Sequence, residues 1–329
     1  MAPFDLDGRQ LFTTASIGVA LYPQDADNGE TLVLNAHIAL NEAKKAGHNS
    51  YRLFEAQMND ELVRFVQTRE ALRTAVERQE LVLHYQPQVD LRSGRVVAVE
   101  ALLRWHRPGA GLTMPQTFID VAEESGLITP IGRWVLREAC RQAVAWHAAG
   151  WPDLVMAVNL SAVQFRQGQV AQDVLAALND SGLDPTHLEL ELTESILLEP
   201  EDTILETVSR WASCGIRLSI DDFGTGYSSL AYLKRFKVDK LKIDRSFIVN
   251  LQRDEEDRAI VLAMIQIARS LNLRTIAEGV EDVELAAQLK GMECDEVQGY
   301  LYTPPLPAAE LTSWLAEREQ RTALPGGIS

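Results

Sequence analysis

From Glu80 onward, short β-branched or leucine-rich runs alternate with longer segments of helical periodicity. Such alternation is typical of β/α units built around a parallel sheet. The runs with strand composition are Leu81 to Gln88, Val96 to Trp105, Val155 to Ser161, Leu188 to Thr193, Arg217 to Phe223, Lys240 to Asp244, Arg274 to Val280 and Glu296 to Tyr302. The helix candidates are Ile131 to Gly150, Gln172 to Gly182, Ile204 to Cys214, Arg258 to Leu271 and Val283 to Lys290. Eight strands with intervening helices predict an α/β fold, a closed (β/α)8 barrel.

The first two strand candidates are joined differently from the others. Only the segment from Val89 to Arg95 separates them, and it contains the turn residues Asp90, Ser93 and Gly94. That segment is too short for a crossover helix, so the two strands are expected to form an antiparallel hairpin. We therefore predict an irregular, modified barrel.

The N-terminal piece has another pattern. Thr14 to Pro23 is strand-like, Leu32 to Ala46 has helical periodicity and ends at Gly47, and Glu55 to Glu70 is a candidate helical connection. About fifty residues of this kind bury little core by themselves. The piece is expected either to pack on the barrel or to be the remnant of a larger domain.

Charge limits the partners of this chain of 329 residues. It contains 31 Lys and Arg residues and 47 Asp and Glu residues, which gives a formal net charge of -16. A chain so acidic is not expected to bind DNA or an anionic membrane, and a polyanionic substrate would need help from cations.

Neither disulfides nor zinc are expected. The three cysteines, Cys140, Cys214 and Cys294, are far apart in sequence, and the six histidines show no ligand spacing. We expect Cys214 and Cys294 to be buried thiols. The segment Met1 to Phe12 is not a signal peptide, and no apolar run reaches about 18 residues. A cytoplasmic location is expected, although a longer parent protein would be free to carry a membrane tether upstream.

Carboxylates and one carboxamide recur near the C-terminal ends of the predicted strands. They are Glu100, Asn159, Glu191, Glu194, Asp221, Asp222 and Glu278. In a barrel these strand ends meet at one mouth, where active sites are built. Oxygen ligands in this number suit Mg2+ or Mn2+ better than zinc or copper.

An alternative is that each acidic residue is a solvated loop residue or a helix cap. Glu100 argues against it, because Val99 and Ala101 flank it within an apolar strand. A buried carboxylate needs a cation or a donor nearby. Lys242, between Leu241 and Ile243, is similar, and a salt-bridged core lysine is its alternative interpretation.

The adjacent pair Asp221 and Asp222 has the arrangement that can bridge two metal ions. The glycines of Phe223-Gly224-Thr225-Gly226 allow the following loop to bend sharply. This segment lacks the full dinucleotide or Walker pattern, so we interpret it as a mobile active-site loop.

These residues together resemble the EAL domain, the bacterial phosphodiesterase of cyclic di-GMP. The resemblance covers roughly Asn59 to Arg318 and is carried by Tyr85 to Pro87, Glu100 to Trp105, Asn159 to Ser161, Glu191 to Glu194, Asp221 to Gly226, Lys242 to Asp244, Ala277 to Glu281 and Gln298 to Tyr300. It implies a TIM-like barrel whose first strand is antiparallel.

The same resemblance assigns roles to particular residues. It implies metal binding by Glu100, Asn159, Glu191, Asp221, Asp222 and Glu278, catalytic roles for Lys242, Glu278 and Glu100, substrate contacts from Gln86, Leu103 and Arg104, and supporting or loop-anchoring roles for Glu194, Glu281 and Gln298. Lys242 would orient the attacking water, and Arg104 would suit a phosphate. Two Mg2+ or Mn2+ ions per site are expected.

The N-terminal piece resembles the end of a GGDEF (diguanylate cyclase) domain, through Ser16 to Ala20, Asn35-Ala36, Ala43-Lys44, Gly47 and Asn49 to Tyr51. The signature loop of that family is missing, and His37 and Asn41 replace its usual residues, so cyclase activity is not expected. The predicted domains are a GGDEF-like fragment at 1–55, a helical connection at 56–70, the barrel at 71–320 and a flexible tail at 321–329.

The resemblance implies metal-dependent hydrolysis of cyclic di-GMP to linear 5'-pGpG, which ends a bacterial second-messenger signal. A non-catalytic cyclic di-GMP receptor is the alternative, and an enolase-like barrel is a second rival that fits the Asp221-Asp222 pair and Gln86-Pro87 less well. The family often dimerises through helices after the fifth and sixth strands, which implies a homodimer formed around Tyr227 to Arg235.

Overall fold

The computed structural model describes residues 4–6, 9–11, 14–45, 49–197, 202–224 and 236–323. It divides the chain into two compact units, Met1–Arg73 and Thr74–Ser329. The boundary lies within helix α2 (Ala56–Ala75), and the segment 56–70 lies in this helix.

The first unit is a small α/β piece. Strands β1 (Phe4–Leu6) and β2 (Arg9–Leu11) form an antiparallel pair, and β3 (Ile17–Val19) pairs in parallel with β4 (Tyr51–Leu53). Helix α1 (Gly29–Lys45) packs on β3 and β4.

Gly18 permits the close approach of α1 to β3. A Cβ at this position would lie 2.0 Å from the carbonyl oxygen of Ala36 and 2.2 Å from the nitrogen of Leu40. The strand is shorter than the predicted Thr14 to Pro23, because Leu21 and Asp25 close a turn in which the Leu21 nitrogen donates to the Asp25 carboxylate at 2.6 Å.

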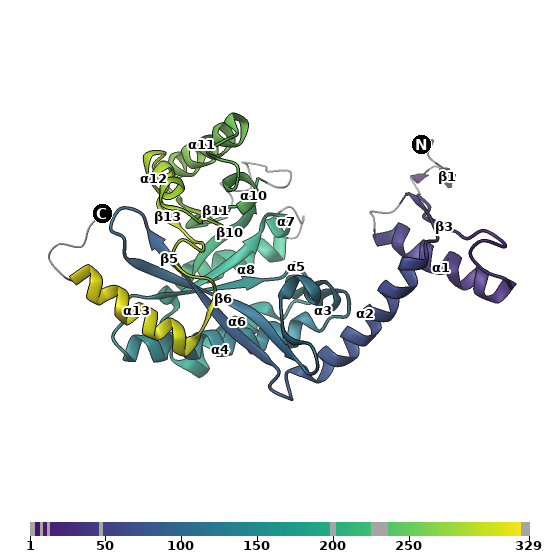
Figure 1. The fold of residues 1–329 in the computed structure, drawn as a ribbon, viewed down its shortest axis with the longest axis horizontal. Helices are drawn as coiled ribbons and strands as arrows, with labels where there is room; N and C mark the ends of the chain where they lie inside the picture. Colours follow the sequence, from purple (N-terminus) through teal and green to yellow (C-terminus); the bar gives the residue numbers. More distant parts are fainter. Residues whose placement is uncertain are drawn as a thin grey trace. The chain divides into compact units, whose positions relative to one another are not determined.

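The second unit is a closed barrel (Figure 1). Its strands in the described residues are β5 (Leu81–Asp90), β6 (Val96–Arg107), β8 (Val155–Leu160), β9 (Leu188–Thr193), β10 (Arg217–Phe223), β11 (Lys240–Ile243), β12 (Arg274–Ala277) and β13 (Glu296–Val297). From β6 to β13 neighbouring strands are parallel. β5 closes the barrel antiparallel to both β6 and β13, which confirms the hairpin and the modified barrel.

Two short strands extend the rim of the barrel. β7 (Gly111–Thr113) pairs antiparallel with the end of β6, and β14 (Leu306–Pro307) pairs antiparallel with β5. Helices cover the outside of the barrel (Figure 1). In the described residues they are α3 (Ile119–Glu124), α4 (Ile128–Ala148), α5 (Ala162–Arg166), α6 (Val170–Ser181), α7 (Glu194–Leu197), α8 (Asp202–Ser213), α10 (Arg245–Ile248), α11 (Glu255–Ser270), α12 (Val283–Gly291) and α13 (Ala308–Ala323). The five predicted helices are present as α4, α6, α8, α11 and α12.

Strand β9 shows why these sequences form a barrel. Leu188, Leu190 and Leu192 alternate with Glu189 and Glu191, and all five side chains are buried. Because successive side chains point to opposite faces of a strand, the leucines pack on one side and the carboxylates on the other. One face is therefore an ordinary apolar core, and the barrel interior is polar.

The last predicted strand, Glu296 to Tyr302, is much shorter in the structure. It ends at Val297, because the backbone of Gly299 packs against Val280, where a Cβ would lie 2.1 Å from the Val280 carbonyl oxygen. A turn closed by Tyr302 follows.

Other boundary predictions need similar correction. The predicted strand Arg274 to Val280 ends at Ala277, before the positive φ of Gly279. The prediction that Cys214 is buried was wrong, since it lies exposed after the last turn of α8, whereas Cys294 is buried. The predicted tail begins inside α13, and residues 324–329 lie outside the described residues.

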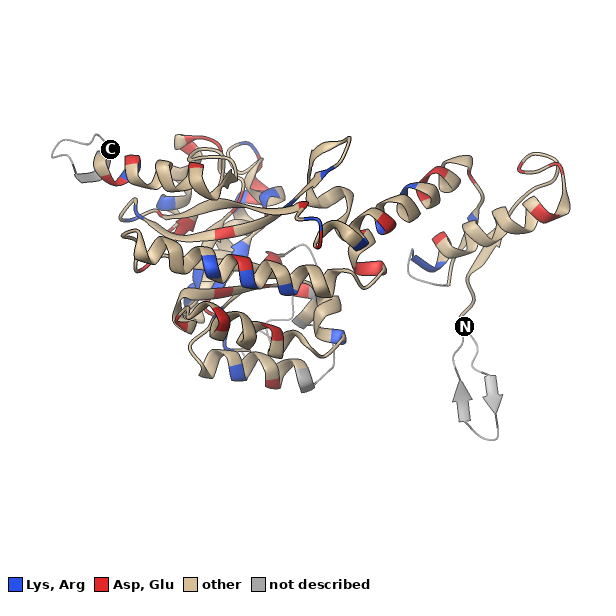
Figure 2. Ribbon diagram, turned by 90° about the horizontal axis from the view of Figure 1, so that it is seen from below, with Lys and Arg blue, Asp and Glu red and all other residues tan. Residues whose placement is uncertain are grey.

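Acidic and basic residues are interspersed along the outer helices (Figure 2). In the part of the chain that the structure describes, no helix has the length and apolarity needed to cross a membrane.

We expect Leu190→Ala to lower the free energy of unfolding of the barrel by about 2 to 5 kcal/mol, because Leu190 is fully buried on β9. Leu175→Ala is the matched control, since Leu175 is 37% exposed on α6, and its cost should stay below about 1 kcal/mol. Urea unfolding followed by tryptophan fluorescence reports on this unit alone, because all six tryptophans lie in it. Equal losses in both variants would contradict the assignment of Leu190 to the core.

Candidate active site

The barrel interior holds polar side chains in two layers. Residues two apart on a strand point the same way, so the side chains separate into an upper and a lower layer. The upper layer, toward the C-terminal strand ends, contains Glu191, Lys242 and Gln298. The lower layer lies on β9, β11 and β13 and contains Glu189, Lys240 and Glu296. On antiparallel β5 the order is reversed, and Gln86 belongs to the upper layer whereas Gln88 belongs to the lower one.

Lys242 stands at the centre of the upper layer. Its Nζ lies 2.6 Å from Glu191 Oε2, 2.6 Å from Glu278 Oε1, 3.1 Å from Asp221 Oδ1 and 3.8 Å from Glu100 Oε1. The Lys242 side chain is 1% exposed, Glu191 is 0% exposed, and Glu278 is 22% exposed. Four strands and their ends thus bring four carboxylates around one ammonium, as the sequence predicted for one mouth of the barrel.

A chain of amides holds Glu100. Asn159 Nδ2 donates to Glu100 Oε1 at 2.6 Å, and Gln298 Nε2 donates to Glu100 Oε2 at 2.5 Å. Gln298 also donates to Gln86 Oε1 at 3.0 Å, and Gln86 Nε2 donates to the Thr303 carbonyl at 3.1 Å. Both oxygens of Glu100 are therefore fixed, and Gln86 and Gln298 are joined to the carboxylate cluster.

The adjacent residues Asp221 and Asp222, at the end of β10, have different surroundings. Asp221 reaches Lys242, whereas Asp222 is exposed and has a positive φ of 55°. The Asp222 nitrogen donates to Asp221 Oδ1 at 3.0 Å. The left-handed backbone at a non-glycine residue marks local strain at this strand end.

Glu194 lies at the start of α7 and accepts a hydrogen bond from the Gly224 nitrogen at 3.2 Å. This contact holds the first residue after β10, at the loop that the family resemblance implies Glu194 would anchor. The rest of the predicted active-site loop and the whole segment Tyr227 to Arg235, expected at a dimer interface, lie outside the described residues.

The remaining predicted residues occupy separate positions. Arg104 is buried on β6 and donates to the Leu103 carbonyl at 2.8 Å, so its guanidinium is anchored to the strand beside Glu100. Glu281 forms an exposed ion pair with Arg245 at 2.7 Å. The structure therefore places Arg104 within the barrel and gives Glu281 a partner on α10.

Burial controls the ionisation of the cluster. It raises the pKa of the Glu278 carboxyl to about 8, although the Lys242 ammonium acts in the opposite direction. Burial, followed by the charge of Glu100, raises the pKa of Glu191 well above its ordinary value. Partial desolvation at the rim of the site and the charge of the neighbouring Asp221 raise the pKa of Asp222. The carboxylates of the cluster repel one another, and one ammonium does not compensate them.

The Lys242 pKa lies well above its ordinary value. Burial alone would lower it, but the carboxylates of Asp221, Glu100, Glu191 and Glu278 together raise it. Lys242 is therefore a charged donor at neutral pH, with no lone pair with which to accept a proton.

The fit of the cluster to metal ions follows from its charge. Among the residues that the structure describes, no three His, Cys, Asp or Glu side chains are arranged as a metal site. The Lys242 ammonium stands between the carboxylates. Five carboxylates surround or flank that single ammonium. Hard oxygen donors with this excess of negative charge are the ligands that Mg2+ and Mn2+ prefer.

Sequence reasoning missed the lower layer. Lys240 Nζ lies 2.9 Å from Glu189 Oε2, 2.9 Å from Glu296 Oε2 and 3.0 Å from Gln88 Oε1. The signal was present, since Glu189 and Lys240 each precede a predicted site residue by two positions on a strand.

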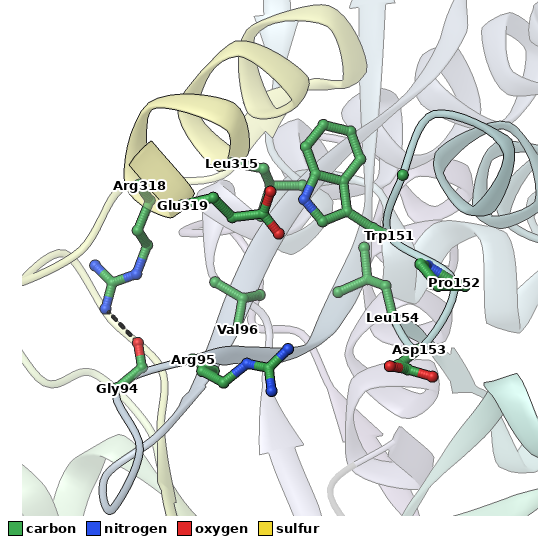
Figure 3. A pocket seen from close by; sticks show the side chains of 11 residues that line it. Gly94, Arg95, Val96, Trp151, Pro152, Asp153, Leu154, Leu315, Arg318 and Glu319 are labelled. Carbon is green, nitrogen blue, oxygen red and sulfur yellow. Dashed lines mark hydrogen bonds between the residues drawn. The ribbon is translucent and has the colours of Figure 1, made fainter. Parts of the chain in front are cut away.

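A cavity of about 320 Å³ lies at the other end of the barrel (Figure 3). Residues at the start of β6, the segment before β8 and α13 line it, among them Arg95, Trp151, Leu154 and Arg318. Arg318 donates to the Gly94 carbonyl at 2.9 Å. None of the predicted site residues lines this cavity, so it is separate from the carboxylate cluster.

A closed β/α barrel with ionisable groups gathered at the C-terminal strand ends is the architecture in which barrel enzymes build their active sites. Residues 69–305 match the EAL domain family, and residues 1–50 match the diguanylate cyclase GGDEF domain. The first match covers well over half of the chain, so the chain belongs to the EAL domain family. Both resemblances inferred from the sequence are thereby confirmed.

Two curated relatives from Pseudomonas aeruginosa are similar to nearly the whole chain. It is 45% identical over 314 residues to MucR, a bifunctional diguanylate cyclase/cyclic di-GMP phosphodiesterase, and 44% identical over 313 residues to the cyclic di-GMP phosphodiesterase NbdA. Each alignment covers 95% of this chain, but only 46% of MucR and 40% of NbdA. The chain therefore spans less than half the length of these relatives.

Solved structures show the same fold. The MucR phosphodiesterase in complex with c-di-GMP has a TM-score of 0.72 and 47% identity, covering 74% of this chain and 99% of that one. The EAL enzyme Bd1971 in its cAMP- and cyclic-di-GMP-bound form has a TM-score of 0.74 and 27% identity, covering 88% of this chain and 77% of that one.

We expect the metal-free protein to lose stability as the pH rises from about 5 to 8, in part through Glu278. Its pKa is about 8 when folded and near 4.3 when unfolded, so the folded state retains a proton that the unfolded chain has released. The contribution cannot exceed about 1.4 kcal/mol per pH unit. Urea unfolding in EDTA should show a shallower pH slope for Glu278→Gln than for wild type. Identical slopes would show that Glu278 does not carry the raised pKa.

Proposed function

We propose that this chain hydrolyses one phosphodiester bond of cyclic di-GMP, using Mg2+ or Mn2+, and releases linear 5'-pGpG. The observation that supports this most is the excess of carboxylates around Lys242, at the end of the barrel where related enzymes act. The proposed role is to end a bacterial second-messenger signal. The names of MucR and NbdA support the same activity and substrate.

The proposed metal ligands are Glu100, Asn159, Glu191, Asp221, Asp222 and Glu278. Asn159 already donates a hydrogen bond from its Nδ2 to Glu100 Oε1, and this bond does not use its amide oxygen. Two divalent ions held by this set would activate a water and stabilise negative charge developing on the phosphate.

Two side chains, those of Lys242 and Glu278, are proposed to act on the attacking water. Lys242, a buried ammonium with a raised pKa, would donate a hydrogen bond that orients the attacking water and would offset charge on the phosphate. Glu278 is partly exposed, and once bound cations keep its carboxylate ionised it would accept the proton that the water loses.

Substrate contacts would come from Gln86, Leu103 and Arg104. Arg104 carries a charged, planar donor group suited to a phosphate, and its position is fixed by the hydrogen bond to Leu103. Glu194 would support the loop after β10 through Gly224. Gln298 would support Glu100, and Glu281 would act through the hydrated rim of the site.

We also propose domain limits at 1–55 for the GGDEF-like fragment, 56–70 for the connection, 71–320 for the EAL barrel and 321–329 for the tail. The matches at 1–50 and 69–305 support these limits. Neither DNA nor a membrane is a proposed partner, in keeping with the net charge of -16.

We expect the wild-type chain to convert cyclic di-GMP to pGpG with Mn2+ or Mg2+ and to stop in EDTA. Glu100→Gln should lower kcat/KM at least about 100-fold, because the carboxylate charge is lost from the cluster. Glu255→Gln is the control, since Glu255 is 93% exposed on α11 and should leave the rate unchanged. Nucleotide chromatography measures both.

Two results would contradict this function. Uncut cyclic di-GMP in the presence of metal, together with binding that is insensitive to EDTA, would favour a receptor. Cleavage by Glu100→Gln at the wild-type rate would remove the carboxylate cluster from the reaction.

We further expect a homodimer, by the family resemblance. Size-exclusion chromatography with light scattering at micromolar concentration should give about twice the mass of the 36.6 kDa chain. A single species with the monomer mass would contradict this proposal without affecting the proposed chemistry.

A further inference from the structure

The lower ionic layer is buried more completely than the active site above it. Lys240 is 4% exposed, Glu189 is 1% exposed, Glu296 is 2% exposed, and Gln88 is not exposed. Lys240 contacts all three of the others at 2.9 to 3.0 Å. A charged group held this tightly below a site can determine how that site is oriented.

The two layers meet at Gln88. Lys240 Nζ donates to Gln88 Oε1 at 3.0 Å, and Gln88 Nε2 donates to Glu191 Oε1 at 3.4 Å. An ammonium can only donate, so the amide oxygen of Gln88 must face Lys240, and its NH2 group is left to face Glu191. Lys240 therefore determines which end of the Gln88 amide faces Glu191.

Glu191 is held at both oxygens as a result. Its Oε2 accepts from Lys242 at 2.6 Å, and its Oε1 faces the Gln88 amide. We propose that Gln88, oriented by Lys240, is a positioning residue that fixes the Glu191 carboxylate for a divalent cation. The inference rests on the proposed metal dependence and adds to it a role for two residues outside the proposed ligand set.

Stability alone does not account for the lower layer. Lys240 and Arg274 balance Glu189 and Glu296, with Arg274 Nε 3.2 Å from Glu296 Oε1. A buried ion pair of this kind is often no more stable than well-packed apolar residues of similar volume. The lower layer acts instead by fixing the position of the Gln88 side chain.

The test compares Mn2+ binding to metal-free protein by isothermal titration calorimetry. Gln88→Met removes the amide without changing charge and should weaken Mn2+ binding about 10- to 100-fold. Lys240→Met should weaken it through the same amide, so the double variant should bind no more weakly than Gln88→Met, within about 2-fold.

Arg274→Met is the control variant, because it removes a cation from the lower layer without removing the contact between Lys240 and Gln88. Arg274 contacts Glu296 and Asp90, and its loss should leave Mn2+ affinity within about 2-fold of wild type. Circular dichroism in EDTA shows whether each variant is folded. If Lys240→Met does not fold, Lys240→Met combined with Glu189→Gln removes the ammonium and one of the two carboxylates it neutralises.

The outcomes separate this inference from the proposed function. Wild-type affinity in folded Gln88→Met, or additive losses in the double variant, would overturn the positioning role while leaving metal dependence intact. Wild-type protein that binds no Mn2+ would overturn the metal dependence and the inference together.

Discussion

The buried ammonium of Lys242 and the carboxylates around it determine what the rest of the barrel must do. Four carboxylates from different strands or strand ends lie within 3.8 Å of one Nζ, in an interior where like charges repel strongly. Only a rigid frame can keep them there. The closed sheet supplies it, because Glu191 and Lys242 lie on strands whose other faces are packed under helices. The amides of Asn159 and Gln298 then fix Glu100.

The two ionic layers differ in charge. In the lower layer, Lys240 and Arg274 offset Glu189 and Glu296, so these four side chains are balanced in charge. In the upper layer, the single ammonium of Lys242 faces a surplus of carboxylates that opens toward the mouth. The lower layer is suited to holding geometry, and the upper one is suited to gathering cations and then a phosphate.

The sequence predicted much of this arrangement, for identifiable physical reasons. The strand pattern and the positions at strand ends predicted that Glu100 and Lys242 lie in one barrel. The short segment after Gln88 predicted that the first strand is antiparallel. Lys240 was missed although it lies two positions before Lys242 on the same strand, because attention to strand ends leaves out the residues one layer deeper in the barrel. The end of the last strand depends on contact between Gly299 and Val280, which pattern alone does not contain.

The most direct test of the central claim is a crystal structure of the protein with Mn2+, in which anomalous scattering locates the ions. Mn2+ peaks are expected within coordination distance of Glu191, Asp221 and Glu278, at the C-terminal ends of the strands. The Lys242 ammonium should then lie beside the ions rather than between the carboxylates. Fully formed carboxylate contacts to Lys242, with no anomalous peak in the barrel mouth at saturating Mn2+, would contradict the claim.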